Sequence, residues 1–287
     1  MARRTGSRAG LRVVTAMKTF RVATLNIWNR SGPWEQRLSA IRAGVGALAP
    51  DIIGLQEVVC LDPDDGDGDG LDQAAAIAQG GAYHVAYGRA HDEPWLGNAV
   101  LSRWPISARD VIDLPHGGTD ERRNLLFTMI EAPFGRVPFF VTHLNWKFHD
   151  GHVREAQVRA IVSRIDAIAP GPGLFPAILV GDFNAEADSD EIRYLRGCTS
   201  LGTGRRVYFQ DAFAFAGGGA PGTTFARSNP YAAILGEPDR RIDYVFVRGR
   251  DEGRRGMPCD ASVCFDEAVG GVFPSDHFGV LATLRAE

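Results

Sequence analysis

Cysteines are scarce in this sequence and long apolar runs are missing, and each shortage excludes a class of protein. The 287 residues include four cysteines, with no Cys-x-x-Cys pair and no zinc-type spacing. We therefore expect free thiols in a reducing compartment, the cytoplasm, and no disulfide framework. No apolar stretch approaches the roughly 18 residues needed to cross a membrane, which argues against an integral membrane protein.

An excess of positive charge is missing as well. The net charge is −4 and the isoelectric point is about 6.0. Proteins that bind duplex nucleic acid over a broad surface usually have a basic domain, so this balance argues against that class. Arginine doublets remain at 122–123, 205–206, 240–241 and 254–255. One of them could line a cleft for an anionic substrate, although solvated surface pairs are the commoner arrangement.

The overall composition is that of an ordinary globular protein, with 45% hydrophobic and 23% charged residues. Residues 1–17 are rich in Arg, Gly and Ser and lack the apolar core of a signal peptide, so we expect a disordered leader, with Met17 as an alternative start. We expect residues 18–287 to form a single catalytic domain, because the polar motifs described below extend from Asn26 to His277.

Periodicity in the sequence predicts a mixed α/β protein. Strands are predicted at residues 19–27, 51–57, 83–87, 97–102, 125–130, 138–145, 178–182, 241–247 and 279–284. Helices are predicted from Pro33 to Leu48 and in the stretch that ends near Ala169, while residues 195–229 are expected to be irregular and to face the substrate. The acidic run 62–70 resembles a calcium loop, but the position that needs Glu is Ala76, so we interpret it as a flexible loop.

The stretch Ile178-Leu-Val-Gly-Asp-Phe-Asn184 is the most informative part of the chain. An apolar run that stops at Gly181 indicates a buried strand whose end carries polar groups. Asp182 and Asn184 could orient and deprotonate water or bind a hard cation. An Asx-turn closing the strand would leave the same pattern.

Other predicted strands also carry acids or amides at their ends. Besides Asp182 and Asn184, these residues are Asn26, Glu57, Asp243 and the pair Asp276-His277. Buried carboxylates are costly to desolvate and repel one another unless a cation or donor compensates them. A divalent ion with oxygen ligands, Mg²⁺ or Mn²⁺, would do so better than zinc.

Seven short motifs follow one another in an order that resembles the endonuclease/exonuclease/phosphatase superfamily. They are Thr24-Leu-Asn-Ile, Leu55-Gln-Glu-Val, Asn98-Ala-Val-Leu-Ser, Thr142-His-Leu, Gly181-Asp-Phe-Asn-Ala, Arg241-Ile-Asp-Tyr-Val and Ser275-Asp-His-Phe-Gly. The resemblance covers nearly the whole chain. It implies a four-layer α/β sandwich, in which two packed, mainly antiparallel sheets lie between helices and the site lies at one end.

The same resemblance implies roles for the acids and for one histidine. Glu57 would ligate Mg²⁺ with Asn26 beside it, and Asp276 could help with the metal. Asp182 and Asn184 would orient and deprotonate the attacking water. His277, held by Asp243, would contact a phosphoryl oxygen and stabilise charge in the transition state.

Substrate contacts are also expected. His143 occupies a position where the family places a phosphate-binding residue, and Asn98, Arg123 and Trp146 are further candidates. Trp28, Trp95 and Trp146 adjoin site motifs, so each could stack on a base or sugar or simply pack in the core.

Three functions remain open from the sequence. We favour a Mg²⁺-dependent phosphodiesterase or phosphomonoesterase acting on a small or lipid-like ester. The alternative is a DNA or RNA nuclease with the same catalytic residues, so nucleic acid stays a candidate partner. A binding module without catalysis is the third, which the full set of expected catalytic residues argues against. The oligomeric state is left open.

Overall fold

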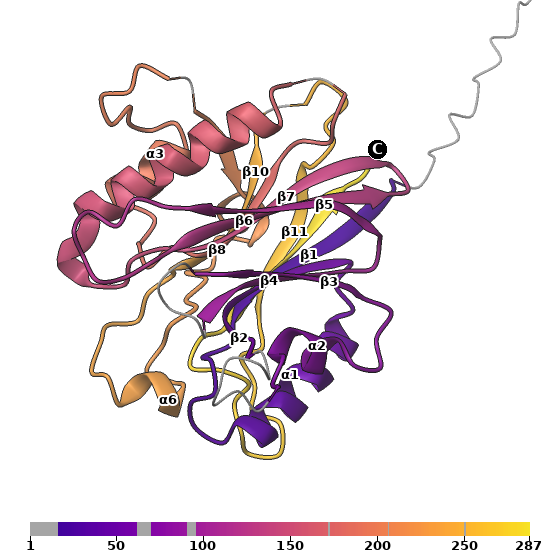
Figure 1. Ribbon diagram of the computed structural model, residues 1–287, viewed down its shortest axis with the longest axis vertical. Coiled ribbons are helices and arrows are strands. Elements are labelled where there is room, and N and C mark those ends of the chain that lie inside the picture. The colour runs from indigo at the N-terminus through magenta and orange to yellow at the C-terminus, as the bar shows by residue number, and fades with distance from the viewer. Residues whose placement is uncertain (1–16, 62–69, 91–95, 172, 206, 250) are drawn as a thin grey trace, which may run out of the picture.

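The computed structural model describes residues 17–61, 70–90, 96–171, 173–205, 207–249 and 251–287. The expected leader up to residue 16, most of the acidic run and Trp95 lie outside these residues. Two six-stranded sheets pack face to face, with helices on their outer faces (Figure 1). This is the predicted four-layer α/β sandwich.

Both sheets are mainly antiparallel. The first sheet has the order β11 (Pro258–Cys264), β12 (Gly279–Arg285), β1 (Thr19–Asn26), β2 (Ile52–Val59), β4 (Leu96–Ser102) and β3 (His84–Arg89). The second has the order β5 (Ile106–Asp113), β6 (Asn124–Ala132), β7 (Gly135–His143), β8 (Ile178–Asp182), β10 (Asp243–Arg248) and β9 (Phe209–Asp211). Among these strands, β1 pairs with β2 and β7 with β8 in parallel, and the other neighbours are antiparallel.

The two sheets share a core between them, and each has a second core beneath its helices. In β8, Ile178 and Val180 belong to the central core, while Leu179 packs in the core that contains residues of α3. The strand is therefore covered on both faces, as its unbroken apolar run predicts. At Gly54 a Cβ atom would lie 2.5 Å from a side-chain carbon of Val180, so glycine permits the close approach of the sheets.

Helices α1 (Trp34–Leu48) and α2 (Gln73–Ala78) cover the first sheet, and α3 (Gly151–Ile168) and α4 (Asp190–Leu195) pack with the second. The described helices also include η1 (Phe148–Asp150), α5 (Ala212–Ala216) and α6 (Pro230–Ala233). The helix predicted from Pro33 to Leu48 is confirmed as α1, and its apolar residues Trp34, Leu38, Ile41 and Val45 form a buried stripe. In the described part of the chain, no helix is both long enough and apolar enough to cross a membrane.

The expectation of an irregular segment at 195–229 was wrong in part, because β9 and α5 lie within it. Strands β5 and β11 and helix α2 have no counterpart in the sequence-based prediction. β5 is an edge strand with five consecutive exposed residues from Ser107 to Val111. An edge strand with so little buried surface has no need of the apolar alternation on which the prediction depends.

Candidate active site

The strand register brings the predicted polar ends together at one end of the sandwich. Asp182, the last residue of β8, is paired with His143 at the end of β7 and with Asp243 at the start of β10. In the first sheet, Asn26 at the end of β1 lies beside Gln56, the neighbour of Glu57. Residues far apart in the sequence thus lie together at the ends of neighbouring strands.

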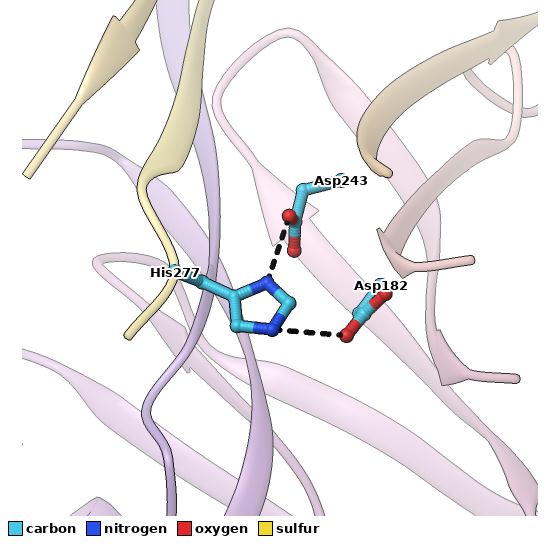
Figure 2. A group of neighbouring side chains, drawn as sticks. All are labelled: Asp182, Asp243 and His277. Atoms are coloured by element: carbon cyan, nitrogen blue, oxygen red, sulfur yellow. Dashed lines mark hydrogen bonds and ion pairs between the residues drawn. The ribbon is translucent and has the colours of Figure 1, made fainter. Parts of the chain in front are cut away.

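His277 lies between two carboxylates (Figure 2). Its Nδ1 donates to Asp243 Oδ2 at 3.1 Å, and its Nε2 lies 3.7 Å from Asp182 Oδ2. Burial by itself would lower the pKa of His277, but Asp243, Asp182 and Asp276 outweigh it and hold that pKa well above the usual value. The imidazole is therefore a cation held in place by Asp243.

Asn26 links the two sheets through their carboxylates. Its Nδ2 donates to Glu57 Oε1 and to Asp182 Oδ2, both at 3.1 Å. Its Oδ1 accepts from the backbone N–H of Trp28 at 2.9 Å. The amide thus faces the carboxylates through its nitrogen, an orientation that holds Glu57 and Asp182 in place and does not offer the amide oxygen to a metal ion.

Asp276 is a buried carboxylate close to other negative charges. Burial raises its pKa to about 7, and the charges of Glu57 and Asp182 add to the increase, against His277 and a hydrogen bond from Ser275. For Asp182, burial and then Asp243 raise the pKa, while His277 and Asn26 oppose them. This group of acids therefore carries more negative charge than the cation His277 relieves.

The residues beside Glu57 fit a hard divalent cation. Glu57 and Asp276 offer carboxylate oxygens, the ligands that Mg²⁺ prefers. A second candidate group consists of Asp182, Asp243 and His277, whose ligand atoms lie within 4.8 Å of one another. The raised pKa of His277 favours the protonated ring, which cannot ligate a metal, whereas Asp243 Oδ1 is buried with no hydrogen-bond partner among the described residues. That Glu57 and Asp276 hold the metal ion stays a prediction.

The second histidine, His143, lies on the other side of Asp182. Its Nε2 is 3.5 Å from Asp182 Oδ2, and its Nδ1 accepts from Arg123 Nη1 at 3.0 Å. Burial, then Arg123 and His277, lower the pKa of His143 well below the usual value. His143 is therefore neutral, with its proton on Nε2 directed toward Asp182.

The remaining candidates differ in how close they lie to this cluster. Asn184 has a positive φ of 50°, and its Nδ2 donates to the Leu144 carbonyl at 3.1 Å, so it lies beyond the end of β8 next to Asp182. Asn98 and Arg123 line a small pocket together with Glu57 and His143. No ring-stacking or cation–π contact of Trp146 is found among the described residues, and its side chain is half exposed.

Trp28 is a packing residue. Its ring lies 4.9 Å from the ring of Tyr231 and 4.9 Å from the guanidinium carbon of Arg37. Both neighbours occupy the ring surface that a base or sugar would need, so the packing alternative is favoured for this tryptophan.

Two residues that were not predicted from the sequence hold Glu57 and the loop that carries Asp276 in place. Asn29 Nδ2 donates to Glu57 Oε2 at 2.8 Å. Arg37, which is fully buried on α1, donates to the carbonyls of Ile27, Trp28, Asn29, Ser31 and Pro274. It thereby ties the loop after β1 to the loop that carries Asp276. The position of Asn29 three residues after Asn26 was a usable signal, whereas nothing in the sequence marked Arg37 as buried.

Comparison with known proteins agrees with this architecture. The model of the Endonuclease/Exonuclease/phosphatase family matches residues 23–277. An endonuclease/exonuclease/phosphatase from Beutenbergia cavernae has a TM-score of 0.70 and 26% identity, covering 93% of this chain and 71% of the other. Truncated TDP2 from Caenorhabditis elegans has a TM-score of 0.68 and 22% identity, covering 93% and 97%. The uncharacterised Escherichia coli protein YbhP is 28% identical over 184 residues, which cover 59% of this chain and 68% of YbhP.

Proposed function

The chain belongs to the endonuclease/exonuclease/phosphatase family, and from this premise we propose that it is a Mg²⁺-dependent phosphoesterase acting on a small or lipid-like ester. The observation that carries the proposal is the position of Asp182. This buried carboxylate lies between two histidines and accepts a hydrogen bond from the amide that also holds Glu57. A proton acceptor, a cation and a set of oxygen ligands therefore lie side by side.

We assign each residue a role that suits its surroundings. Asp182 accepts the proton of the attacking water, and its raised pKa makes it a stronger base than an exposed carboxylate. His277, kept cationic by Asp243, donates from Nε2 to a phosphoryl oxygen as charge develops there. Asn184, beyond the end of β8, helps to orient the water. His143 offers a neutral N–H donor to the substrate phosphate.

Glu57 and Asp276 would hold Mg²⁺ or Mn²⁺, with Asn26 and Asn29 fixing the Glu57 carboxylate. The ion, when bound, neutralises charge on the phosphoryl oxygens. Arg123 and Asn98 would contact the substrate next to His143, and Trp146 is exposed and free to meet a larger substrate at the rim.

Hydrolysis of bis(4-nitrophenyl) phosphate tests the proposal. We expect turnover with Mg²⁺ or Mn²⁺ that is lost in excess chelator and in Glu57→Ala. Glu155→Ala on α3 is the matched control, because that carboxylate pairs only with Arg159 on its own helix among the described residues. Full activity in chelator would contradict the metal requirement. A panel of single-stranded and duplex nucleic acids, sphingomyelin-type lipids and inositol phosphates would separate the small-ester function from a nuclease.

A further inference from the structure

Glu121 is a buried carboxylate on the loop that leads into β6, and it has no part in the roles assigned above. Its Oε2 accepts from Arg123 Nη2 at 3.3 Å and from the backbone N–H of Trp146 at 3.4 Å. Its Oε1 lies 3.7 Å from Lys147 Nζ. One carboxylate therefore joins Arg123, just before β6, to the loop that follows β7.

The ion pair of Glu121 and Arg123 is shielded from solvent. Only 11% of the Glu121 side chain and 13% of the Arg123 side chain are exposed. Water and salt therefore screen this pair less than an exposed pair, whose net contribution is small. Among the described residues, no other carboxylate pairs with Arg123. Within that part of the chain, Glu121 is thus the anion that holds this guanidinium.

The other end of the Arg123 guanidinium contacts His143. Arg123 Nη1 donates to His143 Nδ1 at 3.0 Å. A guanidinium has N–H donors and no acceptor, so Nδ1 accepts this hydrogen bond and cannot carry the ring proton. The proton of the neutral ring is then on Nε2, which lies 3.5 Å from Asp182 Oδ2. The direction of the His143 donor therefore depends on the position of Arg123.

Arg123 needs a second anchor to keep this position. An arginine side chain has many rotamers, and holding it in one of them costs conformational entropy. Its positive charge would also draw it toward a bound phosphate. Because Glu121 engages Nη2 while His143 engages Nη1, the planar guanidinium is fixed at two of its nitrogens.

We propose that Glu121 is a positioning residue, which holds the Arg123 guanidinium against His143 and so keeps the Nε2–H donor of His143 directed into the site. Glu121 acts through Arg123 and His143, and not by contact with the substrate. The proposal rests on the proposed function, because it takes His143 to bind the substrate phosphate. Loss of Glu121 should then weaken substrate binding, and by no more than loss of His143 itself.

Nuclear magnetic resonance of the metal-free protein tests whether Glu121 holds Arg123. A guanidinium that is fixed at two nitrogens gives separate signals for its two NH₂ groups, whereas rotation of a free guanidinium averages them. We expect separate Arg123 signals in the wild type and averaged signals in Glu121→Ala. The signals are assigned by their absence from Arg123→Lys. If Glu121→Ala does not fold, Glu121→Gln replaces it in this measurement and in the kinetics.

Glu191→Gln is the matched control for the loop that follows β7. Glu191 is a buried carboxylate that accepts from Arg154 Nε at 2.6 Å, and Arg154 Nη1 donates to the Lys147 carbonyl at 2.8 Å. This second pair thus holds the same loop without contacting Arg123. Glu191→Gln should leave the Arg123 signals separate, which distinguishes the positioning of Arg123 from a general loosening of the loop.

Steady-state kinetics on bis(4-nitrophenyl) phosphate at saturating Mg²⁺ test the consequence for the substrate. We expect Glu121→Ala to raise KM by about threefold to tenfold and to leave kcat within about twofold, as for loss of uniform binding. In a His143→Gln background, Glu121→Ala should raise KM by less than about twofold, since the residue through which it acts is already lost. Glu121→Gln keeps an acceptor oxygen without the charge and should lie between wild type and Glu121→Ala.

The outcomes separate this role from the proposed function. Separate Arg123 signals in Glu121→Ala would overturn the proposal. Equal rises in KM with and without His143 would overturn it too, because a residue that acts independently of His143 gives that result. A wild type that hydrolyses no ester would refute the phosphoesterase, and the Arg123 signals would still decide whether Glu121 holds the guanidinium.

Discussion

His143 and His277 flank the same carboxylate and are equally buried, with 6% of each residue exposed, yet their pKa values shift in opposite directions. His277 is surrounded by Asp243, Asp182 and Asp276, and becomes a cation. His143 accepts a hydrogen bond from Arg123 and stays neutral. Burial alone does not set the charge of a histidine here, and the partner of Nδ1 is decisive.

The same contrast divides the candidate site into two halves. We call the residues Glu57, Asp182, Asp243, Asp276 and His277 the acidic half, and the residues Asn98, Arg123 and His143 the basic half. The acidic half is suited to a metal ion and to proton transfer, and the basic half to binding the substrate. Substitutions in the acidic half should therefore mainly lower kcat, and substitutions in the basic half should mainly raise KM.

The largest effect is expected from Asp182→Asn, because Asp182 belongs to the acidic half and also lies beside His143 of the basic half. The variant keeps the shape of the side chain but loses the proton acceptor, so we expect turnover to fall by at least about a hundredfold. Steady-state kinetics would measure it, with circular dichroism as the check on folding. Asp190→Asn, in an exposed pair with Arg193, should behave as wild type. Near-normal turnover of Asp182→Asn would remove the residue from its assigned role.

Arg37→Lys should damage the acidic half alone. A lysine has three N–H donors and cannot reach the five carbonyls that Arg37 binds, so we expect a loss of about 2–4 kcal/mol in the free energy of unfolding. Because those carbonyls belong to the loops beside Glu57 and Asp276, Mg²⁺ binding should weaken by about tenfold.

Urea unfolding and calorimetric Mg²⁺ titration would measure the two effects of Arg37→Lys separately. Arg42→Lys, on the same helix but only partly buried, is the control and should cost less than about 1 kcal/mol. If Arg37→Lys lost stability but bound Mg²⁺ as tightly as wild type, the arginine would be structural only.

A smaller effect is expected in the pH dependence of the protein's stability. The folded pKa of Asp276 is raised to about 7, above the ordinary 3.8, so its contribution to stability is present at low pH and is lost as pH rises through about 7. The raised pKa of His277 acts in the same direction, and the lowered pKa of His143 in the opposite one.

We therefore expect the rise in Tm on adding Mg²⁺ to be greater at pH 8 than at pH 5.5. At pH 8 Asp276 has lost its proton, and a bound cation neutralises the carboxylate in its place. Differential scanning calorimetry of the metal-free and Mg²⁺-loaded protein would measure it. Asp276→Asn should make the Mg²⁺ effect nearly independent of pH. An equally strong pH dependence in that variant would place the titrating group elsewhere.

The smallest effect should be that of salt on the basic half. With a net charge of −4, we expect contact with one or two phosphates. Between about 50 and 200 mM salt, kcat/KM should then fall by roughly tenfold or less, whereas six to ten contacts would cost about 10³ to 10⁵. Measurements over a range of KCl at fixed Mg²⁺, with oligonucleotides as the comparison, would test this. A steep slope with a preference for long polynucleotides would favour the nuclease.

The sequence was most informative where a side chain had to be apolar or had to follow a strand. The run from Ile178 to Val180 and the stripe on α1 predicted their elements because both are buried over their length. The polar residues after such runs lie together because strand ends in a shared register meet. Edge strand β5 escaped prediction because little of its surface is buried.

Contacts between distant segments were beyond reach of the sequence. The orientation of the Asn98 amide depends on Asn124 and on the Gly88 carbonyl, and the nitrogen of Asn26 faces Glu57 because its oxygen accepts from Trp28. Arg37 lies on the same helix as the exposed Glu35 and the partly buried Arg42, and only the fold reveals that it is buried. Residue identity predicted what these side chains could do, and tertiary structure determined which atoms face the site.

The division into two halves is tested most directly by measuring kcat and KM separately for His277→Gln and His143→Gln at saturating Mg²⁺ on one phosphodiester. We predict that His277→Gln lowers kcat by at least about a hundredfold with little change in KM, as expected for loss of a transition-state cation. We predict that His143→Gln mainly raises KM, by about tenfold, because it removes a neutral donor to the bound phosphate. Equal losses of kcat in both variants, or turnover unaffected by His277→Gln, would contradict the account.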